Sequence, residues 1–273
     1  MLLVTGANGQ LGTELRALLP QALFADLPDL DITDESAVAE FVKAENIDTI
    51  INAAAYTAVE KAEDDPDLCY KVNVIGPMNL AKTGAKIIHV STDYVFDGKS
   101  YLPYKETDAT NPESVYGQTK RDGERAVMDL SSTCAIFRTA WLYSPYGNNF
   151  VKTMRRLGAE RESINVVFDQ IGTPTYAFDL AQAIVAALPQ IKDGTHEIYH
   201  CSDEGAASWY DFTCEIMRLS GLKCRVNPIT TDQYPTKAKR PFYSVLNKAK
   251  IKSTFGISIP HWQESLEKCL KKF

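Results

Sequence analysis

A tyrosine and a lysine stand four residues apart in the segment VYGQTK, at Tyr116 and Lys120. The segment follows the turn-forming residues PES and precedes the helix-favouring run RDGERAVMDL, so we expect a helix here. Residues four apart lie one turn apart on the same face of a helix. A phenol beside an ammonium group can act as a proton donor whose pKa the cation lowers, because a nearby positive charge favours the phenolate. The same spacing also fits an ordinary solvated helix face, so the rest of the chain decides between the two interpretations.

A glycine-rich segment at the start of the chain points to a second kind of chemistry. In TGANGQLG, Gly6, Gly9 and Gly12 form a G-x-x-G-x-x-G pattern directly after the apolar run LLVT. Glycines at such a turn let backbone amides approach a pyrophosphate at the positive end of a helix, and the last one lets the helix pack close to the sheet. Asp26 follows at the end of the expected second strand, where a carboxylate can bind the hydroxyls of an adenosine ribose. A turn aspartate before LPD is the alternative interpretation.

The elements that must position these residues alternate between strand and helix. Strands are expected at LLVT, ALFAD, DTIINAAA and KIIHVST, and helices at TELRALL, VAEFVKAE and about residues 67–82. This alternation indicates a parallel, doubly wound sheet, and apolar runs such as KIIHV fit strands that are covered on both faces. We therefore predict an α/β fold of the Rossmann type with a smaller C-terminal substrate-binding domain.

Composition narrows the class of protein further. With 273 residues, 45% of them hydrophobic and 23% charged, the chain can bury one large core or two modest ones. A net charge of -6 argues against a nucleic-acid partner. No apolar run approaches the roughly 18 residues that span a bilayer, and LLVTG leaves no room for a signal peptide, so a cytoplasmic protein without a membrane partner is expected. The six cysteines show no C-x-x-C pair and are expected to be free thiols, most of them buried.

The segment HEIYH, residues 196–200, matches the H-E-x-x-H pattern of zinc proteases. That chemistry requires a helix, which brings the two histidines to one metal. Thr, Ile and Tyr after a glycine turn favour a strand, in which the two imidazoles would lie about 13 Å apart. We therefore predict a strand and no zinc site here.

Taken together, these features resemble the extended, sugar-nucleotide-modifying branch of the short-chain dehydrogenase/reductase superfamily. More specifically, seven segments spread over nearly the whole chain are similar to the dTDP-4-dehydrorhamnose reductases: INAAAYTAVEKAE, STDYVFDG, VYGQTK, FRTAWLY, GNNFVKTM, DQIGTPT and RPFYSVLN. The resemblance implies a catalytic set of Thr92, Tyr116 and Lys120 with NADH or NADPH as hydride donor. In that set Tyr116 donates a proton, Thr92 binds the substrate carbonyl oxygen, and Lys120 also holds the nicotinamide ribose.

The resemblance also implies which residues line the ligand sites. The cofactor-binding residues would be Gly6, Asn8, Gly9, Gln10, Leu11, Gly12, Asp26, Asp31, Ile32, Ala53, Ala54, Ala55 and Tyr56, together with Tyr116 and Lys120. The substrate-binding residues would be Tyr94, Trp141, Asn148, Asn149 and Arg240. A core tryptophan is the alternative for Trp141, and loop polar residues often only solvate a turn. The NAD(P)-binding Rossmann domain would comprise residues 1–143 and about 164–189, and the sugar-nucleotide-binding domain about 144–163 and 190–273.

The implied activity is the reduction of the C4 ketone of dTDP-6-deoxy-L-lyxo-4-hexulose to dTDP-L-rhamnose. Two alternatives stay open: a related nucleotide-sugar epimerase or dehydratase, and a non-catalytic NAD(P)-binding regulatory subunit. No basic residue occurs between Asp26 and Lys43, which predicts that NADH serves at least as well as NADPH. The resemblance makes Mg²⁺ and a homodimer possible, but no pair of glutamates aligns with a magnesium site at a subunit contact.

Overall fold

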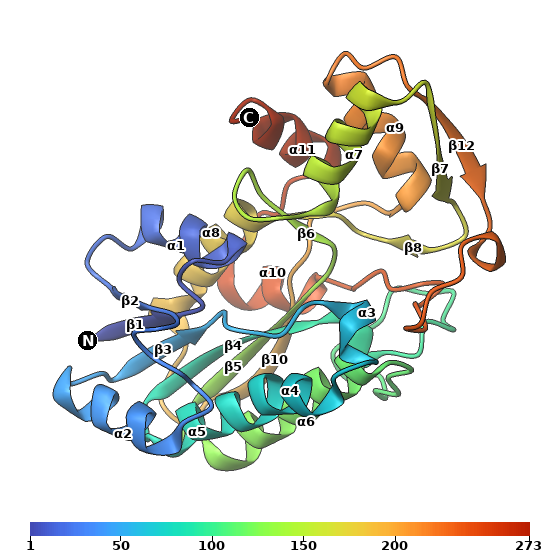
Figure 1. Ribbon diagram of the computed structural model, residues 1–273. Helices are drawn as coiled ribbons and strands as arrows, with labels where there is room; N and C mark the ends of the chain where they lie inside the picture. The colour runs from blue at the N-terminus through green and yellow to red at the C-terminus, as the bar shows by residue number, and fades with distance from the viewer.

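The computed structural model describes residues 1–273 and contains a six-stranded parallel sheet in the order β10-β5-β4-β3-β1-β2 (Figure 1). Its strands are β1 (Leu2–Thr5), β2 (Leu23–Ala25), β3 (Thr49–Asn52), β4 (Lys86–Thr92), β5 (Cys134–Thr139) and β10 (His196–His200). The predicted α/β fold of the Rossmann type is confirmed. In such sheets ligands bind beyond the carboxyl ends of the strands where the strand order reverses, which is here between β1 and β3.

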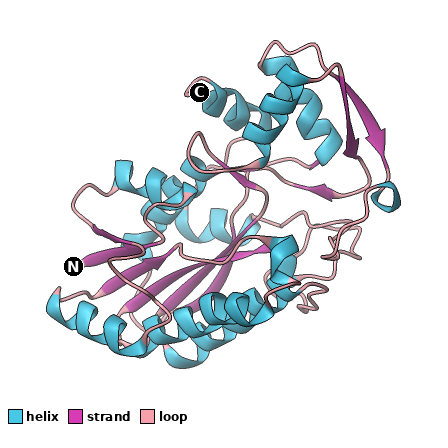
Figure 2. Ribbon diagram, viewed as in Figure 1, coloured by secondary structure: helices cyan, strands magenta, loops and turns pink.

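Helices cover both faces of this sheet, as the side view in Figure 2 shows. One face carries α2 (Glu35–Ala44), α5 (Gly76–Lys82) and α6 (Val115–Leu130), and the other carries α1 (Gln10–Leu18), α8 (Ala177–Ala187) and α10 (Ala249–Phe255). Separate apolar clusters fill the two interfaces: Val38, Leu80 and Val127 belong to one, and Leu15, Leu180 and Ile251 to the other. Burial on both faces explains why the central strands are continuous apolar runs.

The helical segment expected near residues 67–82 is confirmed but is not one regular helix. It consists of α4 (Pro66–Tyr70), a π-helical turn (Lys71–Ile75) and α5, preceded by the short α3 (Val59–Ala62). The wider turn lies against α6, where the backbone carbonyl of Asn73 leaves no room for a β-carbon at Gly123. π-Helical turns often occur at functional sites, and this one faces the helix of Tyr116 and Lys120.

A second lobe lies beyond the carboxyl ends of the strands and has its own apolar cluster. Its helices are α7 (Phe150–Glu160), α9 (Trp209–Leu219) and α11 (Trp262–Leu270). Its strand pairs are β7 (Ser163–Val167) with β12 (Arg225–Ile229), β8 (Ile171–Gly172) with β11 (Ala207–Ser208), and β6 (Leu142–Tyr143) with β9 (Thr175–Tyr176). Three 3₁₀ turns complete the structure, at Asp93–Val95, Leu188–Gln190 and Thr231–Gln233.

Three elements, β7, β10 and α10, lie on the other side of the expected domain boundaries. The segment 164–189 was expected in the Rossmann domain, but β7 pairs with β12 in the second lobe, and only α8 returns to the sheet. Conversely, β10 and α10 were expected outside that domain, yet β10 is an edge strand of the main sheet and α10 packs beneath it. The sequence pattern identifies a strand or helix, but the partner against which it packs depends on the whole chain.

The strand predicted at HEIYH is confirmed as β10, and its two histidines have separate partners. The ring of His196 contacts the carbonyl oxygens of Met128 and Ser132, whereas His200 Nδ1 lies 3.0 Å from the carbonyl oxygen of Tyr104. The chain contains no group of three or more His, Cys, Asp or Glu side chains that could hold a metal ion. All six cysteines are free thiols, and five of them are buried. None of the helices is both long and apolar enough to span a membrane.

Candidate active site

The helix α6 presents Tyr116 and Lys120 on one buried face, as their spacing predicts. Ser114 precedes the helix, and its side chain caps it by accepting a hydrogen bond from the backbone amide of Gly117. A β-carbon at Gly117 would collide with the backbone carbonyl of Tyr94, so the glycine allows α6 to lie against the end of β4. Lys120 is only 2% exposed, and its ammonium group donates a 2.7 Å hydrogen bond to the carbonyl oxygen of Val90. The face of the helix that carries Tyr116 and Lys120 is therefore held directly against β4.

Thr92 ends β4 and completes the expected set. Its hydroxyl is buried, caps the 3₁₀ turn Asp93–Val95 by accepting from the amide of Tyr94, and donates to the carboxylate of Asp93 at 3.1 Å. A hydrogen bond with Thr92 also acts on Tyr116, where it lowers the pKa of the phenol. The structure thus brings together all three residues that were predicted to carry the chemistry.

The pKa of the Tyr116 phenol is raised, whereas the nearby lysine was expected to lower it. Burial raises the pKa of Tyr116 well above its usual value and outweighs the lowering effect of Thr92, and nearby Asp93 raises it further. Burial also lowers the pKa of Lys120 to about 8, against the raising effect of Glu124. The pKa of Tyr116 is therefore set mainly by the loss of water around the phenol and not by the charge of Lys120. Tyr116 is therefore a protonated phenol at neutral pH, which suits a proton donor.

Asp93 is a buried carboxyl group that the sequence did not assign to this site. Asp93 is 1% exposed, and one of its carboxylate oxygens accepts a hydrogen bond from the hydroxyl of Thr92. Burial raises the pKa of Asp93 to about 6, although hydrogen bonds from Ser244 and Thr92 act to lower it. A partly protonated acid therefore lies in hydrogen-bond contact with Thr92.

The glycine turn between β1 and α1 fits a dinucleotide closely. Gly6 has a φ of +70°, and a β-carbon there would meet the backbone of Ala53 and Ala54 after β3. A β-carbon at Gly12 would meet the carbonyl oxygen of Gly6, so both glycines are required by close backbone approach. Gly9 caps α1, whose N-terminus faces the carboxyl edge of the sheet. A turn with this geometry can accept a diphosphate at the point where the strand order reverses.

The remaining predicted cofactor residues surround this turn. Asp26 directly follows β2 and accepts hydrogen bonds from the backbone amides of Asn8 and Leu27, at 3.0 and 2.9 Å. Asp31 is exposed, and Ile32 is buried against Gly76. Gln10 and Leu11 begin α1, and Ala53, Ala54, Ala55 and Tyr56 form the half-buried segment after β3.

Two buried asparagines, which sequence reasoning missed, hold that half-buried segment in place. Asn52 accepts hydrogen bonds from Thr5 and from the amide of Ala54, and its amide nitrogen lies 3.1 Å from the ring of His89. Asn73, in the π-helical turn, bonds both the amide and the carbonyl of Tyr56. The position of Asn52 directly before the small-residue run Ala53–Ala55 is a signal that could have identified it, because buried amides must find partners. No comparable pattern marks Asn73 in KVNVIG.

The predicted substrate residues lie mostly at the junction of the two lobes. The ring of Tyr94 meets that of Tyr116 edge-on, with centroids 5.5 Å apart. Arg240 forms a 2.8 Å ion pair with Glu60 of α3. Burial raises the pKa of the Tyr94 phenol, and the nearby guanidinium of Arg240 acts to lower it. Asn148 is exposed.

Asn149 and Trp141 have structural contacts of their own. The Asn149 side chain caps α7, and its amide nitrogen donates to Gln10 at 2.9 Å, so it connects the second lobe to the glycine turn. Trp141, at a φ of 46°, stacks on Trp209 with ring centroids 3.5 Å apart. Contact of either residue with substrate stays a prediction.

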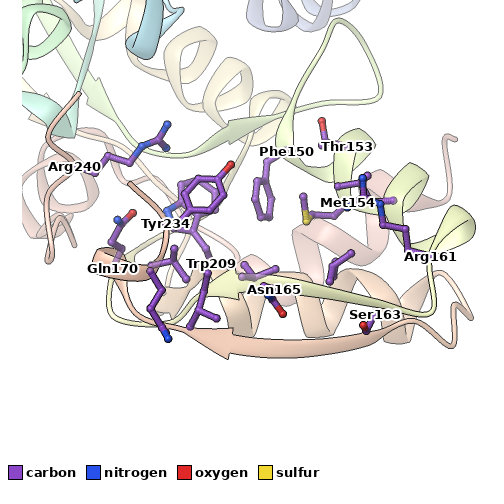
Figure 3. A pocket seen from close by; sticks show the side chains of 16 residues that line it. Phe150, Thr153, Met154, Arg161, Ser163, Asn165, Gln170, Trp209, Tyr234 and Arg240 are labelled. Carbon is purple, nitrogen blue, oxygen red and sulfur yellow. The ribbon is translucent and has the colours of Figure 1, made fainter. Parts of the chain in front are cut away.

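A cavity of about 650 Å³ in the second lobe provides a further candidate ligand site (Figure 3). Arg240 lies at one end and Arg161 near the other, with the rings of Phe150, Tyr234 and Trp209 between them. Thr92, Tyr116 and Lys120 are not among its lining residues. Arg240 links the cavity to them, because it contacts Tyr94, whose ring touches Tyr116.

Comparison with known proteins places this geometry in a family. The model of the RmlD substrate binding domain matches residues 1–273. The chain belongs to this family. A dTDP-4-dehydrorhamnose reductase from Aggregatibacter actinomycetemcomitans is 44% identical over 97% of each chain. The crystal structure of a dTDP-4-dehydrorhamnose reductase from Clostridium acetobutylicum superimposes with a TM-score of 0.95 at 45% identity, covering 99% of this chain and 98% of the other. The Bacillus anthracis dTDP-4-dehydrorhamnose reductase, in complex with NADP, gives a TM-score of 0.94 at 40% identity, covering 100% and 99%.

Proposed function

We propose that this chain reduces the C4 ketone of dTDP-6-deoxy-L-lyxo-4-hexulose to dTDP-L-rhamnose with NADH or NADPH. The observation that carries the proposal is the meeting of Thr92, Tyr116 and Lys120 at the end of β4, beside a glycine cradle that fits a dinucleotide. Membership of the RmlD substrate binding domain family over the whole chain supports the same substrate class. Relatives with this name match almost the whole of this chain, and the match covers almost the whole of their own length.

The residues of β4 and α6 supply the proton chemistry of the reaction. A nicotinamide cofactor held beside these residues would supply hydride for the carbonyl carbon. The carbonyl oxygen then carries negative charge, and the buried phenol of Tyr116 donates its proton to that oxygen. The hydroxyl of Thr92 orients the same oxygen by a hydrogen bond. One hydride and one proton thus convert the ketone to the alcohol, and the phenolate regains a proton from solvent.

Lys120 and the β1–α1 turn would hold the cofactor. The turn around Gly6, Gly9 and Gly12 would bind the diphosphate through backbone amides, and Asp26 would bind the adenosine ribose. Lys120 would bind the nicotinamide ribose and provide positive charge beside the phenol.

The cavity of the second lobe has the chemistry to bind the nucleotide part of the substrate. Its aromatic rings can stack on a base, and guanidinium groups such as those of Arg240 and Arg161 match the geometry of a diphosphate. Because Arg240 contacts Tyr94 next to Tyr116, a diphosphate at Arg240 would leave the sugar within reach of the catalytic residues.

The decisive experiment is an assay of the purified protein against a panel of dTDP- and other nucleotide-linked 4-ketosugars with each reduced cofactor. We expect oxidation of the cofactor and appearance of dTDP-L-rhamnose with dTDP-6-deoxy-L-lyxo-4-hexulose. Absence of cofactor oxidation with that ketosugar would overturn the substrate assignment, and oxidation with another member of the panel would identify the replacement.

The same preparation tests the dehydratase alternative. Elimination from a hexose requires a base in addition to the tyrosine. The dehydratases that resemble this chain carry Asp-Glu directly after the catalytic threonine, whereas here Thr92 is followed by Asp93 and a second phenol, Tyr94. Burial raises the pKa of Tyr94 to about 12, against the lowering effect of Arg240, so it stays protonated near pH 7. We expect no 4-keto-6-deoxy product from dTDP-glucose with added NAD, and its formation would contradict the proposed reductase.

A further inference from the structure

A row of buried charged and polar groups continues along α6 behind Lys120. Tyr116, Lys120 and Glu124 stand at intervals of four residues and therefore share one face of the helix. Glu124 receives two hydrogen bonds from Arg138 of β5, from Nε to Oε1 at 2.8 Å and from Nη2 to Oε2 at 2.7 Å. The side chains of Arg138 and Glu124 are 3% and 4% exposed. This ion pair is thus fully enclosed between the catalytic helix and the sheet.

Stability alone does not account for such a pair. Two charges removed from water lose hydration that their attraction only about balances, and replacing a buried ion pair with apolar residues of similar volume is often neutral or stabilising. Removing one partner, in contrast, is strongly destabilising, because the other charge is left buried and unpaired. The pair is better explained by a neighbouring group whose charge state depends on the carboxylate of Glu124.

Lys120 is such a neighbour, because its buried ammonium has one protein acceptor, the carbonyl oxygen of Val90. The titratable groups that face it are Tyr116 and Glu124 on α6, Cys69 on α4 and His89 on β4. Burial raises the pKa of the Cys69 thiol and lowers the pKa of His89 well below its usual value, so both are neutral near pH 7. Glu124 is consequently the group that supplies negative charge to this lysine.

We propose that Glu124 is a positioning residue for Lys120: its carboxylate, fixed by the two hydrogen bonds from Arg138, balances the buried ammonium one helical turn away. Lys120 thereby stays charged and in place beside Tyr116. This inference rests on the proposed function, in which Lys120 serves the cofactor and the proton donor.

Charge balance predicts a definite order among three forms of the protein. Glu124→Gln removes the balancing charge and leaves the Arg138 cation nearby, so the midpoint at which Lys120 loses its proton should fall most. The double variant Glu124→Leu/Arg138→Met removes both charges and fills the space with apolar groups. Its midpoint should lie between those of Glu124→Gln and the wild type.

The midpoint can be measured without cofactor by NMR titration of protein labelled with carbon-13 at the lysine ε positions. The Lys120 signal is assigned by its loss in Lys120→Arg. For the wild type we expect a midpoint near pH 8, because burial lowers the pKa of Lys120 to about 8. For Glu124→Gln we expect a fall of about one to three pH units. If that variant does not fold, a midpoint below the wild-type value in the double variant supports the proposal by itself.

A purely structural role makes the opposite prediction. The double variant would then fold stably and titrate at Lys120 like the wild type, and this result would overturn the proposal. Asp122→Asn is the matched control, because it removes a carboxylate from the same helix that pairs instead with Arg121. It should leave the Lys120 midpoint unchanged.

A separate measurement tests the function on which the inference rests. Binding of NADH and NADPH to Lys120→Met, compared with the wild type, reports whether Lys120 serves the cofactor. Unchanged binding would contradict that role, whereas the titration reports charge balance independently of any ligand.

Discussion

At the scale of single residues, burial is the feature that sets Tyr116 apart. It keeps the phenol protonated, although the hydrogen bond with Thr92 acts to lower its pKa. Tyr116→Phe retains the ring and its edge-on contact with Tyr94 but removes the only transferable proton of the side chain. We predict that turnover is abolished while NADH binding, measured by fluorescence titration, is nearly unchanged. A variant that kept more than a few per cent of the wild-type rate would refute the assigned role of Tyr116.

Asp93 leads to a prediction about stability and pH. The pKa of this carboxyl group is raised by burial from 3.8 to about 6, so between these pH values the folded chain holds a proton that the unfolded chain has lost. Its contribution to stability therefore decreases as pH rises through this window and is least favourable above pH 6. We expect Asp93→Asn to gain stability relative to the wild type on going from pH 4 to pH 7, measured as the difference in melting temperature. An equal difference at both pH values would show that Asp93 does not titrate in this way.

At the scale of the elements, we predict that the segment between β2 and α2 governs the choice between NADH and NADPH. Asp26 faces the glycine turn through its bond to the amide of Asn8, and Asp29, Asp31 and Asp34 follow before α2 begins. A 2′-phosphate on the adenosine ribose would meet these carboxylates, and a basic residue first occurs at Lys43. We predict that kcat/KM with NADH is at least equal to that with NADPH, and that Asp26→Ala shifts the ratio toward NADPH. A strong preference of the wild type for NADPH would imply a cation from another element.

At the scale of the whole molecule, a strap at residues 237–240 closes the second lobe onto α3. The Glu60 carboxylate accepts from the guanidinium of Arg240 at 2.8 Å and from the amide of Lys237 at 2.9 Å, and the Lys237 ammonium reaches Asp64 at 2.6 Å. This strap places Arg240 between the cavity and Tyr94. The lobes are therefore joined at the position proposed for the diphosphate.

Arg240→Met tests that position. Hydrogen bonds to charged groups contribute roughly 1.5–3 kcal/mol, so we expect KM for the sugar nucleotide to rise about tenfold or more, with cofactor binding unchanged. Lys239→Met is the control, because this neighbouring cation pairs with Glu113 and is largely exposed. Equal effects of the two substitutions would show that only general positive charge matters.

Local patterns in the sequence were sufficient for the elements and for the residues that act within them. The apolar runs of β1 and β4, the glycine spacing of the first turn and the four-residue interval on α6 are properties of neighbouring residues. The strands, the tight turn and the shared buried face of Tyr116 and Lys120 could therefore be predicted directly. The strand at residues 196–200 was predicted for the same reason. Family resemblance added the roles of Thr92 and Arg240.

Contacts between distant residues, in contrast, were decided by the tertiary structure. The pairing of β7 with β12, the place of β10 at the edge of the sheet, and the ion pairs of Arg138 with Glu124 and of Arg240 with Glu60 join segments that no periodicity connects. Burial depends on the same assembly, which is why the pKa of Tyr116 rises although a lysine lies one turn away. A residue's type and spacing specify what it can do, but only the packed chain determines how much water and which charges surround it.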